Sequence, residues 1–259
     1  MATAKKAEEK NTGLAIITQE DFAIASFADI KEVMEENLDS TFSEFDLPKI
    51  TMASGGLTKL VRNTIAGEEV LDTVEVVIIA KKNVRVYYQD ENALGTAPDC
   101  HSDDMVTGIG KRPGDINVCS HDCATCPMSQ WDSGKDDVGK ACKEKVVLAV
   151  LLPGEIIPSV ISVPATSAKN FRVYTMQLTQ SQMRFHQVVT EIGVAKSKSA
   201  GGKDYGKLTF TFKGVLADDQ KQSVGATRSA FEPMFKKISA RSVDPVETES
   251  ETETDTDTE

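Results

Sequence analysis

The sequence predicts a mainly β protein with few helices. Segments rich in β-branched and aromatic residues recur along the chain and are separated by short turn-forming stretches, which is the pattern of strands. The chain has 259 residues, of which 40% are hydrophobic, so one domain can bury a sizeable core. A cluster that holds all five cysteines interrupts the strand pattern in mid-chain. We therefore expect a sheet-based domain with a cysteine-rich insertion.

The first half of the chain is expected to contain one helix followed by strands. Apolar residues at helical spacing predict a helix over residues 27–37. Pro48 and the Gly55-Gly56 pair then break helical structure and indicate the entry into a sheet. Residues 70–80 and 83–88 have strand composition, and Lys81-Lys82 between them predicts the turn of a hairpin.

The second half is expected to contain two pairs of strands. Pro153-Gly154 marks the turn between strands at 145–152 and 156–163. Two further strands are expected at 185–194 and 205–215. They should be joined by a loop rich in Lys, Ser and Gly, which could act as a flexible cationic clamp.

Two helices complete the predicted architecture. Thr166 or Ser167 is expected to cap a helix that ends near residue 178, and a last helix over 218–238 should be interrupted near Pro233. About six strands with a helix before the last two suit a small, highly curved antiparallel barrel. An OB-fold fits this order best, because it carries a helix in mid-chain and tolerates long loop insertions.

The cysteines predict a metal site. Cys123-Ala-Thr-Cys126 has the spacing that lets two thiolates hold one tetrahedral ion. Cys100 and Cys142 are expected to complete a closed site of four thiolates around a structural zinc ion (Zn2+). Cys119 and His121 are alternative ligands, since Cys119 is also within chelating reach of Cys123 and His121 offers an imidazole. Disulfide bonds are the competing interpretation.

The expected cellular compartment favours metal over disulfides. The first ten residues lead into polar sequence and do not resemble a secretory signal, so we expect a reducing, cytoplasmic location. Clustered thiols in that compartment bind metal more often than they form disulfides. The apolar runs are too short to span a bilayer, so no membrane partner is expected.

The ends of the chain are expected to lie outside the folded domain. Residues 1–18 are polar and predict a flexible N-terminus, whereas 244–259 contain eight acidic residues and no basic one and predict a disordered acidic tail. Residues 19–243 then form an OB-like nucleic-acid-binding domain with the zinc-binding insertion at 98–143. Residues 169–241 hold thirteen basic and five acidic residues. The tail should therefore compete with nucleic acid for this basic half, or act only as a solubilising extension.

Five residues are candidate contacts to a nucleic acid. Strand alternation places Arg85 and Tyr87 together on one exposed face, where a ring can stack on bases and a cation can meet phosphate. Lys169 and Arg172 lie on the polar side of the predicted helix after residue 166. Lys213 points outward from the last predicted strand.

Other aromatic residues are expected to pack rather than to bind. Phe171 and Tyr174 lie three residues apart on the predicted helix and should face the core. Trp131 follows the cysteine pair and should cover the metal site, with stacking on a base as the alternative.

The sequence contains no familiar arrangement of catalytic residues. The three histidines form no paired-His metalloprotease motif, and no His-x-Glu precedes the cysteine pair as it does in zinc deaminases. The nucleophile motif Gly-x-Ser-x-Gly is absent. We therefore expect a binding protein and not an enzyme.

Several segments together resemble bacteriophage and prophage single-stranded DNA-binding proteins. The matching motifs run through about 45–215 and are Phe45-Asp-Leu-Pro-Lys-Ile50 with Gly55-Gly56, Cys100-His-Ser-Asp-Asp104, Cys123-Ala-Thr-Cys-Pro127 with Trp131, Gly139-Lys-Ala-Cys-Lys143, Val163-Pro-Ala-Thr-Ser167 and Val188-Val-Thr190. The resemblance implies an OB-type fold, a bound zinc ion and sequence-independent binding of single-stranded DNA in phage replication or recombination, without catalysis. It also implies a location in the host bacterial cytoplasm and favours Cys100 over Cys119 as the fourth ligand.

A zinc-ribbon adaptor is the alternative function. Such a protein would bind replication or transcription machinery through its cysteine knuckle and its acidic tail. In either case replication or recombination proteins are the expected partners of the tail. Binding to single-stranded DNA separates the two functions.

Overall fold

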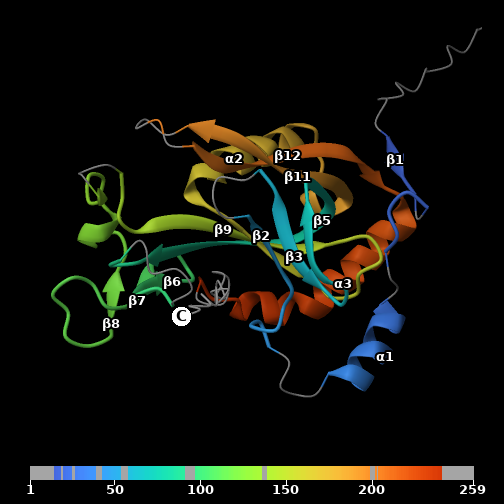
Figure 1. Cartoon of the computed structure of the whole chain (residues 1–259). Coiled ribbons are helices and arrows are strands. Elements are labelled where there is room, and N and C mark those ends of the chain that lie inside the picture. The colour runs from blue at the N-terminus through green and yellow to red at the C-terminus, as the bar shows by residue number, and fades with distance from the viewer. Residues whose placement is uncertain are drawn as a thin grey trace, which may run out of the picture.

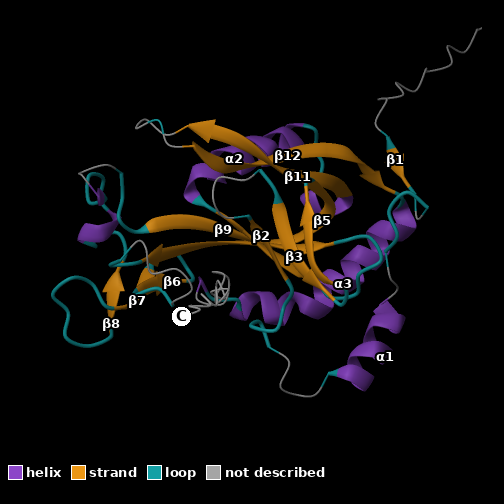
Figure 2. Ribbon diagram, in the orientation of Figure 1, coloured by secondary structure: helices purple, strands orange, loops and turns teal. Residues whose placement is uncertain are grey.

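The computed structural model describes residues 15–18, 20–24, 27–38, 43–53, 58–90, 97–135, 139–198, 202 and 204–240. Within these residues twelve strands form one strongly curled sheet, and three α-helices pack around it (Figures 1 and 2). The predicted fold class, mainly β with few helices, is confirmed. The predicted acidic tail and most of the loop after residue 198 lie outside the described residues.

The elements follow one another along the chain as strands with interspersed helices. The strands are β1 (Ile16–Ile17), β2 (Lys49–Met52), β3 (Leu60–Thr64), β4 (Gly67–Leu71), β5 (Thr73–Tyr87), β6 (Cys100–Ser102), β7 (Thr107–Gly110), β8 (Cys119–Asp122), β9 (Lys143–Leu151), β10 (Ser159–Val163), β11 (Val188–Lys198) and β12 (Asp204–Leu216). The helices are α1 (Phe27–Asn37), α2 (Ala165–Gln180) and α3 (Asp218–Lys237), with short 3₁₀ turns η1 (Pro127–Ser129) and η3 (Phe185–Gln187).

The main path of the sheet has the order β1-β12-β11-β5-β9-β10-β2-β3-β4. Its pairs are antiparallel except β1 with β12 and β2 with β10, which are parallel. The outer edges of β12 and β10 are therefore occupied by β1 and β2, and the described strands do not close into a barrel. Strands β6, β7 and β8 branch from the end of β5 as a separate antiparallel meander.

Strand β5 joins the parts of the sheet. Its beginning pairs with β11, its remainder pairs with β9, and a register shift between Ile78 and Ala80 marks an irregularity of the kind that bends a strand. The predicted hairpin at Lys81-Lys82 is wrong, because both lysines pair with β9 in mid-strand. Both charged groups have polar surroundings. Lys81 is exposed to solvent, and Lys82 Nζ donates to the carbonyl oxygens of Lys236 and Ile238 at the end of α3, at 3.2 and 2.5 Å.

Both faces of the central strands are buried, which explains the nearly continuous apolar sequence of β9. On the inner face of the curl, Ile78 and Leu148 pack with Phe171 and Tyr174 of α2, as the sequence predicted for the two aromatic residues. On the outer face, α3 covers the alternating residues of β5 and β9. Its contribution to that core is Val224, Phe231, Phe235 and the following Ile238.

The helices differ from expectation at their ends. No side chain caps α2: its N-cap is Pro164, and Ser167 Oγ instead accepts a hydrogen bond from Leu208 N at 2.9 Å. Helix α3 continues through Pro233, so the predicted interruption is wrong. The buried rings of Phe231 and Phe235 lie 6.2 Å apart and anchor the helix on both sides of the proline. No helix in the described ranges is both long and apolar enough to cross a membrane.

Two residues of the predicted flexible N-terminus are part of the sheet. Ile16 and Ile17 form β1 and pair in parallel with Val215 and Leu216. Gly214 permits this contact, because a Cβ at that position would lie 2.6 Å from Ile17 Cγ1. The rest of the predicted segment, 1–14, lies outside the described residues.

A buried hydrogen bond joins α2 to the sheet and provides a test of the inner core. Tyr174 Oη and Thr190 Oγ1 lie 2.7 Å apart, and both residues are at most 4% exposed. Tyr174→Phe and Thr190→Val should each lower the free energy of unfolding by about 1–3 kcal/mol, since each leaves one buried polar group without a partner. The loss in free energy of unfolding of the double variant should be smaller than the sum of the losses of the two single variants. Additive losses in urea unfolding would contradict the pairing.

Candidate functional site

The end of β5 brings two distant cysteines together. Cys100 begins β6 and pairs with Tyr87 on one edge of β5. Cys142 directly precedes β9, whose first residue pairs with Val86 on the other edge. Tyr87, Cys100 and Cys142 form a small buried cluster against which Met128 packs.

The Cys123–Cys126 turn is held by local hydrogen bonds. Asp122 Oδ1 accepts from Ala124 N at 2.9 Å, which fixes the turn at the end of β8. Cys123 N donates to Val106 O at 2.8 Å, and Cys142 N donates to Met128 O in the turn after Cys126, also at 2.8 Å. These bonds tie the second pair of cysteines to the strands that carry the first.

The four cysteines line one small cavity. Cys100, Cys123, Cys126 and Cys142 are each at most 9% exposed, none of the five cysteines is in a disulfide, and the enclosed space is about 10 Å³. That is room for about one water-sized particle. Gly108 completes the wall, because a Cβ there would lie 3.3 Å from Cys100 Sγ and 3.4 Å from Cys123 Sγ.

In the absence of a metal ion the cavity disfavours negatively charged sulfur, and donors in its wall offset this only in part. Burial, reinforced by the neighbouring thiols, raises the pKa of Cys100 to about 11, and burial raises the pKa of Cys142 to about 11. Arg112 opposes the rise at Cys100, while Ser129 and Arg85 oppose it at Cys142. Arg85 Nε and Ser129 Oγ are buried donors without a hydrogen-bond partner, and both residues line the cavity. Thiolates around a dication would give these donors the negative charge they lack.

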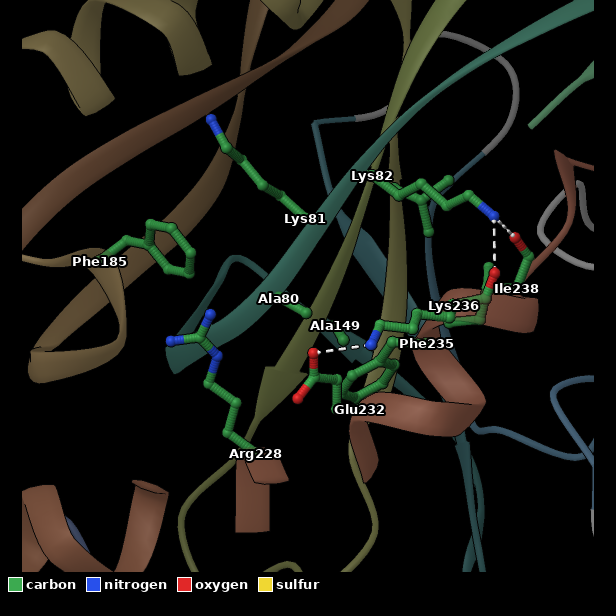
Figure 3. Close-up of a pocket in the computed structure, with 11 residues that line it drawn as sticks. Ala80, Lys81, Lys82, Ala149, Phe185, Arg228, Glu232, Phe235, Lys236 and Ile238 are labelled. Carbon is green, nitrogen blue, oxygen red and sulfur yellow. Dashed lines mark hydrogen bonds and ion pairs between the residues drawn. The ribbon is translucent and has the colours of Figure 1, made fainter. Parts of the chain in front are cut away.

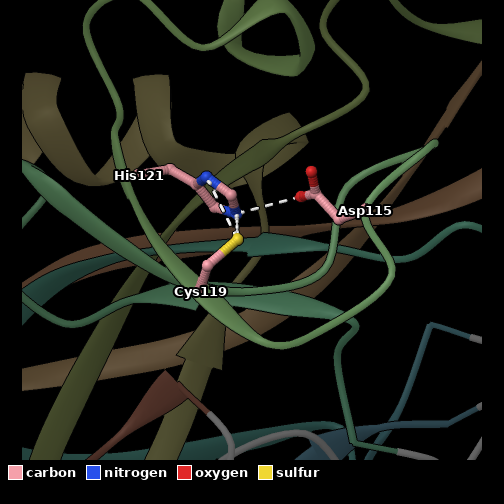
Figure 4. Close-up of side chains that lie close together, drawn as sticks. All are labelled: Asp115, Cys119 and His121. Carbon is pink, nitrogen blue, oxygen red and sulfur yellow. Dashed lines mark hydrogen bonds and ion pairs between the residues drawn. The ribbon is translucent and has the colours of Figure 1, made fainter.

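A second group of metal-binding side chains lies beside this cavity (Figure 4). One ligand atom each from Asp115, Cys119 and His121 lies within 4.8 Å of the others, so this group could hold a metal ion. It is the only group of three or more ligand atoms this close together in the described part of the chain, and the four cavity cysteines are not among its members. Cys119 and His121, predicted as alternates for the four-cysteine site, thus meet Asp115 at a place of their own.

The predicted exposed face of β5 is wrong. Tyr87 is 6% exposed and packs on Cys100 and Cys142, and the Arg85 side chain is 16% exposed with Nη2 3.2 Å from Glu144 Oε1. Both residues face the cysteine cavity, because β6 and the turn before β9 cover this side of the strand end. Arg85 and Tyr87 therefore support the cysteine-rich insertion at 98–143, the cysteine module, from within. They do not form an open surface on which bases could stack.

The other three predicted DNA contacts are at the surface. Lys169 and Arg172 are exposed on α2, as expected. Lys213 on β12 lies 3.2 Å from a carboxylate oxygen of Glu75 and 3.1 Å from one of Glu191, and hydrogen bonds to these carboxylates raise its pKa. Its charge is therefore offset locally and is less available to a phosphate.

Trp131 does not cover the cysteines. Its side chain is 75% exposed, and Lys140 Nζ lies 5.8 Å from the ring centroid. Tyr87 and Met128 occupy the covering position instead, since both line the cavity. An exposed ring beside a cation retains the geometry needed for the predicted alternative, stacking on a base.

A cationic groove lies where the outer face of β5 meets α3 and η3 (Figure 3). Its volume is about 460 Å³, and Lys81, Arg228 and Lys236 contribute charged groups to its wall. Phe185, which is partly buried, lies between the Lys81 and Arg228 side chains in Figure 3. A second hollow of about 440 Å³ shares Lys81, Phe185 and Arg228 and adds Arg184.

The charge of the groove is mainly positive. Glu232 is its one acidic lining residue and lies 3.0 Å from Lys236 Nζ. Arg228 Nη1 lies 3.2 Å from His186 Nδ1. Burial, together with the positive charges of Arg228 and Arg184, lowers the pKa of His186. The groove therefore combines cations with aromatic rings at its edge.

Sequence reasoning missed the groove. Lys81-Lys82 is predicted as a turn, and Arg228 and Lys236 fall within the predicted last helix without an assigned role. The available signal was the interruption of a long strand-forming sequence by two lysines, which alternate across a strand instead of turning it. The partners across the groove come from segments far apart in the chain.

Comparisons of the chain with protein-family models, with curated proteins and with solved structures find no match. Function must therefore be argued from the chemistry of these sites.

Proposed function

We propose that this protein binds single-stranded DNA without sequence preference and acts in bacteriophage DNA replication or recombination. The observation that carries the proposal is the groove in which Lys81, Arg228 and Lys236 accompany Phe185. Single strands are bound in this way, because cations follow the phosphates and every base offers a face to an aromatic ring. The function is binding, without catalysis.

The arrangement of strands supports an OB-type fold. The strands β10-β9-β5-β11-β12 form a continuous run, and α2 connects β10 to β11. Numbered from β5, this is the order 3-2-1-4-5 with a helix between the third and fourth strands, which is the arrangement of the partly open, five-stranded OB barrel. The cysteine module then lies between the first two strands, and the connection from Lys198 at the end of β11 to Asp204 at the start of β12 is the loop between the last two. These are the loops with which OB-folds bind oligonucleotides.

We further propose that Cys100, Cys123, Cys126 and Cys142 hold a structural zinc ion. Four buried thiols around one small space are the donor set of a closed zinc site, and the unpaired donors of Arg85 and Ser129 fit its negative charge. The metal, when bound, supplies cross-linking of the module and no chemical step. The acidic tail is the proposed docking segment for replication or recombination proteins.

One observation favours the adaptor function as a second candidate. Large apolar side chains are exposed on the cysteine module: Val106 (62%), Ile109 (50%), Ile116 (85%), Val118 (64%) and Trp131 (75%). Exposed apolar residues gathered on one small module can form a protein-binding surface. An adaptor would use this surface and the tail, and would leave the groove empty of nucleic acid.

Titration of a labelled oligo(dT) against the full-length protein separates the two functions. We expect binding that weakens steeply with salt, with a slope of log affinity against log salt of about −0.7 for each phosphate contact. Unlabelled mixed-sequence single strands should compete as well as oligo(dT), and duplex DNA should compete poorly. Absence of binding at low ionic strength would reject the single-strand function and leave the adaptor.

A further inference from the structure

His121 on β8 is surrounded by more acceptors than it can satisfy. Its Nε2 lies 3.2 Å from Asp115 Oδ2, 3.2 Å from Gly110 O and 3.5 Å from Cys119 Sγ. One ring nitrogen carries at most one proton, yet a carboxylate, a carbonyl and a sulfur converge on it. The side chain is only 4% exposed, so water is largely excluded as a further partner.

Two of the three spacings between these atoms agree with those that a tetrahedral ion would impose. Zinc bonds of about 2.0–2.1 Å to nitrogen and oxygen and about 2.3 Å to sulfur place tetrahedral N and S ligands about 3.5 Å apart, and N and O ligands about 3.3 Å apart. The distances from His121 Nε2 to Cys119 Sγ and to Asp115 Oδ2 are 3.5 and 3.2 Å. All three ligand atoms lie within 4.8 Å of one another.

The group adjoins the four-cysteine cavity, and His121 also contributes to the wall of that cavity. The backbone of His121 pairs with Gly108, whose missing side chain leaves the space beside Cys100 and Cys123. Arg112 lies between the two sites, and its Nε is 3.2 Å from Asp115 Oδ2. Asp115 raises the pKa of Arg112 most, and Cys126 raises it further. The arginine can thus balance negative charge on both sides.

We propose that Asp115, Cys119 and His121 bind a second divalent transition metal ion of the zinc class. A nitrogen, a sulfur and an oxygen donor from the protein leave the fourth position open, in contrast to the four-thiolate site. Cys119 is exposed, so this position is accessible to solvent and the ion is exchangeable. The ion joins β8 to the loop before it and stiffens the outer half of the module.

Metal content of the full-length protein tests this proposal. Wild-type protein purified with zinc and without chelators should contain about two zinc ions per chain, and a mild chelator should remove about one of them first. Cys119→Ser, His121→Ala and Asp115→Asn should each lower the content by about one ion. Ser120→Ala, an exposed neighbour on β8, is the matched control and should retain both ions.

Cobalt substitution provides a second measurement. Cys119→Ser should weaken the thiolate-to-cobalt absorption while circular dichroism remains that of the wild type. A zinc content that is unchanged in both Cys119→Ser and His121→Ala would overturn the second site. One ion in the wild type that is lost in these variants would uphold the triad and instead reject the four-thiolate site. The titration with oligo(dT) tests the proposed function independently of the metal site, because the groove contains none of the three metal ligands.

Discussion

Cys126→Ser should release the proposed structural zinc ion and disorder residues 98–143, while the protection of β9 and β11 against hydrogen exchange persists. A structural zinc contributes about 10–16 kcal/mol to the folding of zinc-finger peptides, so this is the largest effect expected from a single side chain here. Besides its strand pairing, the module has only a small apolar core, which consists of Tyr87, Cys100 and Cys142 with two partly buried neighbours.

Hydrogen exchange and zinc analysis measure both consequences in one preparation. Ala124→Ser is the matched control, since it introduces the same hydroxyl at an exposed position of the same turn. It should retain zinc and protection. Unchanged zinc content in both Cys126→Ser and Cys142→Ser would show that these thiols do not hold the ion.

The double variant Lys81→Ala/Arg228→Ala should weaken binding to oligo(dT) and lower the magnitude of its salt slope by about 1.4, which corresponds to two lost phosphate contacts. Both side chains are exposed, and both line the two hollows that meet at Phe185. Phe185→Ala should cost a further 1–3 kcal/mol, about 5- to 150-fold in affinity, if its ring stacks on a base.

A control of equal charge isolates the groove from the net charge of the protein. Lys213→Ala/Lys237→Ala also removes two exposed cations, of which Lys213 is offset by Glu75 and Glu191 and Lys237 lies outside the groove. This variant should leave the salt slope nearly unchanged. Equal losses in the two double variants would indicate that binding responds to net charge alone and that the groove is not the site.

The elements of the fold followed from local sequence to a large extent. The helix at 27–37, the turn at Pro153-Gly154, the inward-facing Phe171 and Tyr174 and the pairing of β11 with β12 were all predictable. Each depends on the spacing of apolar side chains or on turn residues within a few positions. The hairpin at Lys81-Lys82 failed for the complementary reason. Two adjacent lysines are typical of a turn in sequence. They fit within a strand here because Lys82 donates hydrogen bonds to carbonyl oxygens at the end of α3, which the local sequence does not reveal.

By itself, the sequence predicted the mainly β class, the interruption of the sheet by the cysteine segment and, as candidate metal ligands, the cysteines and His121, but not Asp115. Only the tertiary structure decided how they group. The edges of β5 bring Cys100 and Cys142 together, Cys119 and His121 join Asp115 instead, and Arg85 and Tyr87 turn toward the sulfur atoms. The groove also arises from contacts between β5, η3 and α3. Spacing along a chain fixes the local direction of side chains, but the meeting of remote segments depends on the curvature of the sheet that carries them.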